Sequence, residues 1–218
     1  MTLSIFSAVR AAMRPRMLQG AGAWVATTGC IGVAVYAAIA YSVFPLGALV
    51  HPQMKLAFQA HGIAIYTHIA ASALALVLVP VQLAAGWRRK HPAWHRRAGR
   101  VYLAAGVLPG GLSGLHLAQS AFGGALSTWG FSLLSVCWLG TATLAYLAIR
   151  RGDVPAHRRC MLLNVALTFA AVTLRLYLGL FFASGVPFEL FYPWVSWLCW
   201  VPNLLLMTVY VARRPAVP

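Results

Sequence analysis

The sequence predicts an all-α fold, a polytopic bundle of six transmembrane helices with both termini in the cytoplasm. Hydrophobic residues make up 61% of the 218 positions and charged residues only 9%, which is far from the composition of a soluble globular domain. The apolar residues are gathered in long stretches almost free of charge, and most cations lie in short segments between them. This alternation is typical of a multi-pass membrane protein.

Six apolar stretches are long enough to cross a bilayer, since about 20 residues at a rise of 1.5 Å span the hydrocarbon core. The predicted helices cover residues 21–44, 59–86, 101–123, 125–149, 160–183 and 192–211. Together they form one transmembrane domain, residues 21–212. Residues 1–20 place apolar side chains among three arginines, which predicts an amphipathic segment on the cytoplasmic surface. Residues 213–218 are predicted to be a cytoplasmic tail.

The distribution of cations predicts the orientation of these helices. The loop at residues 87–100 contains six cations and no acid, the composition of a cytoplasmic loop under the positive-inside rule. Of the 17 Lys and Arg residues, 15 fall on the same side as this loop, one (Lys55) on the opposite side, and one (Arg175) within a span. The formal net charge of +15 therefore orients the protein and predicts no nucleic-acid partner.

The two inner basic loops resemble each other. Each contains two arginines, five intervening residues and the triplet His-Arg-Arg, at residues 88–97 and again 62 positions later at residues 150–159. This similarity has two interpretations. Either spans two and three are repeated as spans four and five, as in membrane proteins with parallel repeats, or two basic loops are simply alike in composition.

Four ionisable side chains fall in the outer half of the predicted bundle. His61 and His68 lie seven residues apart on the second span, which places them on one helix face. His116 lies on the third span and Arg175 on the fifth, all within roughly 15 Å of the outer surface at 1.5 Å per residue. Ionisable residues inside a membrane are functional candidates by default. The sequence therefore predicts a functional layer in the outer half.

Arg175 has no acidic partner inside the membrane, because neither Asp153 nor Glu189, the two acids of the chain, falls in a predicted span. A guanidinium at this depth needs backbone carbonyls, water or an anionic ligand. The same absence argues against carboxylate-based proton or sodium coupling.

Several short motifs together carry a family resemblance. They are Tyr66-Thr67-His68 and Pro80-Val81-Gln82 on the second span, Trp94-His95-Arg96 and residues 99–102 after it, and residues 157–161, 167–178 and 197–203. These motifs resemble the bacterial membrane family catalogued as domain of unknown function 2306. The resemblance implies a helical bundle in the bacterial cytoplasmic (inner) membrane and carries no activity. In architecture alone, the chain is similar to di-haem b-type membrane cytochromes.

Three functional hypotheses are compatible with the outer layer. The first is a b-type haem held by His68 and His116 as metal ligands, with His61 as a substitute ligand and Arg175 pairing a propionate, for transmembrane or quinone-linked electron transfer. The second is a non-haem metal site built from the three histidines. It is less favoured because a seven-residue separation strains a single-ion site.

The third hypothesis is a non-enzymatic protein that binds or transports a lipid, a quinone or a small solute in an outer pocket centred on Arg175. A structural or accessory membrane subunit, in which these polar groups only pair between helices, remains the alternative. No residue set predicts hydrolytic catalysis.

Two further features concern partners. A basic group at the inner interface is expected to contact anionic lipid headgroups; it consists of His95, Arg96, Arg100, His157 and Arg158. On the third span, Gly106, Gly110 and Gly114 recur every four residues, a spacing that lets helices approach closely. This glycine face predicts a close helix contact and a possible surface for homo-oligomerisation.

Overall fold

The computed structural model describes the backbone of residues 3–213 and the side chains of residues 22–213. Within this part of the chain all regular structure is helical, so the predicted all-α fold is confirmed. The helices are α1 (Leu3–Val43), α2 (Pro52–Ala60), α3 (Gly62–Leu83), α4 (Ala85–Lys90), α5 (Pro92–Val101), η1 (Tyr102–Val107), α6 (Leu108–Ala118), α7 (Gly124–Arg150), α8 (Val154–Thr168), α9 (Ala170–Ser184), α10 (Phe188–Leu198) and α11 (Val201–Ala212).

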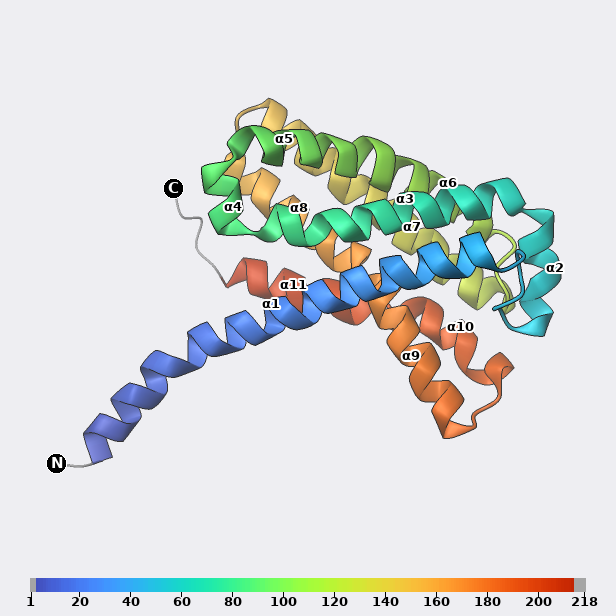
Figure 1. Cartoon of the computed structure of the whole chain (residues 1–218), viewed down its shortest axis with the longest axis horizontal. Helices are drawn as coiled ribbons and strands as arrows, with labels where there is room; N and C mark the ends of the chain where they lie inside the picture. Colours follow the sequence, from blue (N-terminus) through green and yellow to red (C-terminus); the bar gives the residue numbers. More distant parts are fainter. Residues whose placement is uncertain (1–2, 214–218) are drawn as a thin grey trace.

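Six helical segments of the described chain are long and apolar enough to cross a membrane, as predicted. They cover Gly22–Val43, Gly62–Leu83, Pro92–Ala118, Gly124–Arg150, Val154–Ser184 and Phe188–Ala212. Helix α1 is longer than its span, and its first half extends away from the bundle (Figure 1). The side chains of the predicted amphipathic segment, residues 1–20, lie outside the described residues, as does most of the predicted tail.

The third, fifth and sixth spans are not uniform α-helices. The third passes through the π-helical segment η1 just before Pro109, which has no backbone N–H to donate to the preceding turn. The fifth changes direction at Phe169, between α8 and α9, and the sixth is interrupted between α10 and α11. Helices α9 and α10 consequently diverge together from the long axis of the bundle, and α10 keeps its packing against α7 (Figure 1).

One side chain holds the two interrupted spans together. Asn203 Nδ2 donates to Thr173 Oγ1 at 2.9 Å and to the Cys199 carbonyl at 3.0 Å. Thr173 lies on α9, and Cys199 lies at the break between α10 and α11. Non-helical backbone at membrane depth requires such internal partners. Asn203 therefore stabilises the region from which α9 and α10 diverge.

The structure supports the interpretation of the basic loops as parts of an internal repeat. Helices α3, α5 and α6 each begin 62 positions before α7, α8 and α9. The pairs of first residues are Gly62 and Gly124, Pro92 and Val154, and Leu108 and Ala170. Tyr102 and Asn164, also 62 positions apart, form a direct hydrogen bond of 2.7 Å. Repeat-related residues therefore meet in the centre of the bundle.

The glycine face of the third span packs inside the chain. A Cβ atom on Gly106 would lie 3.1 Å from the Ala75 side chain, and one on Gly110 would lie 3.1 Å from the Trp138 ring. A Cβ atom on Gly114 would lie 3.1 Å from the His68 ring. The predicted close contact is thus made with α3 and α7 of the same chain. The structure gives no support to the expectation that this face is a surface for homo-oligomerisation.

Gly110→Leu is expected to destabilise the bundle, because the added side chain must displace Trp138 and Ser72. Overpacking of this kind costs about 1–3 kcal/mol. Gly140 on α7 is the matched control, since a Cβ atom there meets nothing within 4 Å. Thermal unfolding in detergent should show a lower midpoint for Gly110→Leu than for Gly140→Leu, and equal midpoints would contradict the packing described here.

The orientation of the bundle also has a direct test. If the cation-rich loops are cytoplasmic, reporter fusions should report the cytoplasm after Arg16, Lys90, Gly152 and Arg214, and the outside near Gln53 and Gly185. A single loop on the opposite side would rule out the six-span arrangement with both termini inside.

Candidate functional site

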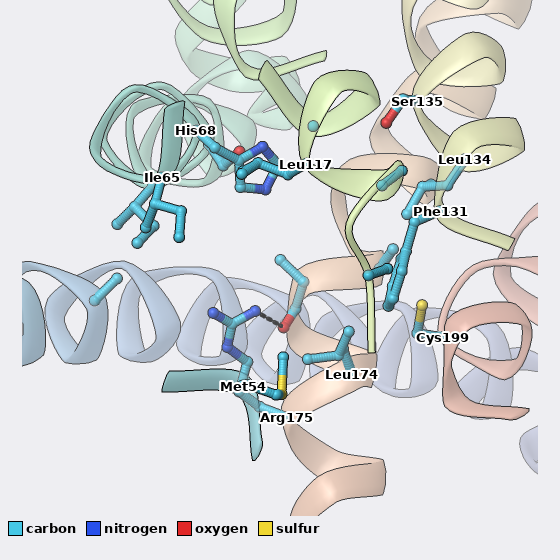
Figure 2. Close-up of a pocket in the computed structure, with 18 of the residues that line it drawn as sticks. Met54, Ile65, His68, Leu117, Phe131, Leu134, Ser135, Leu174, Arg175 and Cys199 are labelled. Carbon is cyan, nitrogen blue, oxygen red and sulfur yellow. Dashed lines mark hydrogen bonds between the residues drawn. The ribbon is translucent and has the colours of Figure 1, made fainter. Parts of the chain in front are cut away.

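A cavity of about 420 Å³ lies where α9 and α10 leave the bundle. Its volume falls in the range typical of small-molecule sites. Side chains from α1, α2, α3, α6, α7, α8, α9 and α10 line it, and most of the labelled ones in Figure 2 are apolar. Two of the predicted site residues, His68 and Arg175, face this same cavity from different helices (Figure 2).

Helix geometry holds His68 in one orientation. Its Nδ1 lies 2.8 Å from the Gly110 carbonyl oxygen, and a carbonyl only accepts, so Nδ1 carries the hydrogen in this contact. In the neutral ring, Nε2 is then an acceptor. The described residues provide no hydrogen-bond partner for Nε2, and the ring is turned toward the cavity (Figure 2). His68 therefore offers an acceptor to a bound molecule.

Arg175 enters the cavity from α9 with little compensation for its charge. Its Nη1 donates to the Ala171 carbonyl at 3.2 Å, the interaction drawn in Figure 2. Tyr41 and Tyr192 lie within electrostatic range of the guanidinium and also line the cavity. The remaining donors of Arg175 have no hydrogen-bond acceptor among residues 22–213. The sequence predicted that Arg175 lacks an acidic partner in the membrane, and the compensation that the structure shows is the single carbonyl of Ala171.

Neither acid of the chain is positioned to neutralise Arg175. The carboxylate of Asp153 caps α8 by accepting the N–H of Ala156 at 2.8 Å. Glu189 accepts a hydrogen bond from Gln53 Nε2 at 2.8 Å, and the lining of the cavity contains no acidic side chain. A charged arginine at the centre of a membrane helix costs about 2.5 to 3.5 kcal/mol on insertion scales. An anionic ligand would offset this cost.

The other two predicted histidines occupy a different place. The His61 and His116 rings contact each other edge to face, with centroids 5.2 Å apart, and neither lines the cavity. Among the described residues, no group of three or more His, Cys, Asp or Glu side chains is arranged to hold a metal ion. Haem ligation by His68 and His116 stays a prediction, and the predicted site residue that shares a cavity with His68 is Arg175.

A buried polar network that sequence reasoning missed lies beside the cavity. Tyr102 Oη is 2.7 Å from Asn164 Oδ1 and 2.6 Å from Thr168 Oγ1. Trp138 Nε1 donates to Thr168 Oγ1 at 2.9 Å, and Asn164 Nδ2 donates to the Trp138 carbonyl at 2.7 Å. If Thr168 donates to Tyr102 and Tyr102 to Asn164, every donor in the network has an acceptor.

This network joins η1, α7 and α8, and two of its members, Trp138 and Thr168, line the cavity. Its residues are uncharged, so a search for ionisable groups in the membrane could not find them. The spacing of 62 positions between Tyr102 and Asn164 is the signal in the sequence that could have found this pair. The network makes one wall of the cavity rigid.

Comparison with protein families gives a match that covers most of the chain. A family model described as "Predicted membrane protein (DUF2306)" covers residues 65–211. The chain belongs to this family. No curated protein and no solved structure matches it. The DUF2306 match begins within α3 and extends into α11, so it includes His68, the polar network and Arg175.

Tyr102→Phe should lower stability, because it removes the donor to Asn164 Oδ1 and leaves that buried oxygen unpaired. We expect a loss of about 1–2 kcal/mol. Tyr146→Phe is the control, since Tyr146 is exposed and its hydroxyl only accepts from Arg150. The thermal midpoints of the two purified variants should differ, and a Tyr102→Phe protein as stable as Tyr146→Phe would show that the network contributes little.

Proposed function

We propose that this multi-pass membrane protein binds a small amphiphilic molecule in the outer-half cavity, with an anionic head on Arg175 and an apolar body against the helices. The observation that carries the proposal is the unneutralised guanidinium in a cavity with mostly apolar walls. We place the protein in the bacterial cytoplasmic membrane, where acidic lipids and quinones are available. The role is binding or transport, without a chemical step.

The charge of the cavity supports an anionic head. A guanidinium presents its donors as a planar fork that matches a carboxylate or phosphate, and only one donor of Arg175 is occupied, by the Ala171 carbonyl. The tyrosines near it, Tyr41 and Tyr192, carry hydroxyls that can donate to the same group. Nothing acidic in the cavity lining competes with the ligand.

The remaining walls support an amphiphile over a small inorganic anion. Apolar side chains on α3, α6, α7 and α9 line much of the cavity, among them Ile65, Leu117, Phe131, Leu134 and Leu174 (Figure 2). Such walls favour a molecule with a hydrocarbon or aromatic portion. On the α3 side, Nε2 of His68 can accept a hydrogen bond from a hydroxyl of the same molecule.

A b-type haem is the second candidate, and one specific observation favours it. The Nδ1–H of His68 is held by a backbone carbonyl while Nε2 faces the cavity, which is the arrangement that orients histidine ligands of metals. Arg175 would then pair a propionate. An absorption spectrum of protein purified from haem-replete cells tests this candidate, because a reduced b-type haem has sharp Soret and alpha bands.

Ligand retention by purified variants tests the main proposal. Arg175→Gln should weaken binding about 10- to 100-fold, because removing a charge-assisted hydrogen bond costs about 1.5 to 3 kcal/mol. Arg175→Lys should restore only part of the affinity, since an ammonium lacks the planar fork. His68→Ala should release the same molecule. The measurement is mass spectrometry of molecules that co-purify with each variant.

Arg213→Gln is the matched control, because Arg213 is an exposed arginine at the end of α11. It should retain the wild-type content of the ligand. A folded Arg175→Gln protein with unchanged content would remove Arg175 from the site, and loss of a haem spectrum in His68→Ala alone would favour the second candidate.

A further inference from the structure

The two basic loop motifs come together at the inner end of the bundle. His95 on α5 and His157 on α8 occupy equivalent positions of the repeat, 62 positions apart, and each lies in the first turn of its helix. The His95 imidazole lies within electrostatic range of His157, Arg88 and Arg96. Two arginines and an imidazole from the first copy and an imidazole from the second copy therefore surround one place.

Arg88, His95, Arg96 and His157 form what we call the inner cluster. Hydrogen bonds hold the part of it that lies on α4 and α5 in position against α3. Gln82 is buried at the end of α3, and its Nε2 donates to the His95 carbonyl at 3.2 Å. Arg88 Nη1 donates to the Gln82 carbonyl at 3.3 Å, which brings its guanidinium back toward α3. Because Arg88 uses Nη1 in this contact, its other donors remain available to a bound group.

The α8 half presents an oriented imidazole. His157 Nδ1 lies 2.9 Å from the Ala145 carbonyl, so it donates there and leaves Nε2 for other contacts. Asp153, the acid in this loop, accepts the N–H of Ala156 as the cap of α8. On α5, by contrast, no side chain caps the N-terminus, and free N–H groups there favour an anion.

We propose that the inner cluster of Arg88, His95, Arg96 and His157 binds the phosphate group of an anionic phospholipid. The guanidinium donors of Arg88 and Arg96 converge there beside the imidazoles of both repeat copies, without a nearby carboxylate partner. Trp87 and Trp94 are exposed beside the cluster, and exposed tryptophans at helix ends lie at the headgroup level of a bilayer. Basic pockets between helices on the cytoplasmic side suit acidic headgroups. This site is separate from the cavity that contains Arg175.

The test uses the full-length protein in detergent micelles supplemented with phosphatidylglycerol, phosphatidylcholine or inorganic phosphate. Native mass spectrometry measures retained lipid, and thermal unfolding measures the stabilisation that each addition produces. Wild-type protein should retain phosphatidylglycerol and be stabilised by it more than by phosphatidylcholine. Arg88→Gln with Arg96→Gln should bind phosphatidylglycerol about 10- to 30-fold more weakly, since each basic residue near the surface contributes to attraction of acidic lipid.

The matched control combines Arg150→Gln with Arg151→Gln. It removes the same charge from the same membrane face, but Arg150 donates to the hydroxyl of Tyr146, which is not one of the four residues of the cluster. The control should keep nearly wild-type retention of phosphatidylglycerol. Arg96→Gln alone, at an exposed position, provides a second variant in case the loss of the Arg88 contact to Gln82 unfolds the chain, and it should weaken binding about threefold or more.

Each outcome either shows whether the bound phosphate belongs to a lipid or to a soluble molecule, or rejects the site. Inorganic phosphate that stabilises the protein as well as phosphatidylglycerol does, through the same residues, would support a phosphate site and assign it to a soluble ligand. If the cluster variants and the control variant lose phosphatidylglycerol retention equally, the proposal is overturned in favour of diffuse attraction by the basic loops. Equal retention of phosphatidylglycerol and phosphatidylcholine by wild-type protein would also overturn it.

Discussion

The pairing of polar groups within the membrane is the constraint on which this structure depends. In hydrocarbon, a backbone or side-chain polar group without a partner is costly, so helices must satisfy such groups internally. Asn164, Thr168 and Tyr102 satisfy one another, and Asn203 does the same where two spans are interrupted. The open donors of Arg175 and the open acceptor of His68, by contrast, face one cavity.

The cavity arises where the two copies of the repeat differ. In the first copy, Gly110 and Gly114 allow α6 to pack closely on α3. The equivalent positions in the second copy are Val172 and Leu176. Val172 packs against Gly29 of α1 instead, and α9 diverges from the bundle with α10 (Figure 1). Small residues thus close one half of the repeat, and larger ones leave space in the other half.

The same repeat places positive charge at both ends of the bundle in different ways. At the end with the basic loops, the equivalent residues His95 and His157 lie together, because the first turns of α5 and α8 are related by the repeat. In the half that contains the cavity, Arg175 has no cationic equivalent, since the corresponding position is Ser113. An anionic ligand at the first end would meet repeat-related groups, and one in the cavity would meet a single unmatched arginine.

The sequence by itself determined the helical class, the six spans and the layer in which His68 and Arg175 lie, because these follow from hydropathy, length and the 1.5 Å rise of a helix. Only the tertiary structure decided which side chains meet. His116 faces His61 and not His68, and the glycine face packs within the chain. These contacts depend on the rotation of each helix about its axis, on the π-helical turn and on the break at Phe169. The depth of a residue along its span specifies none of these three features.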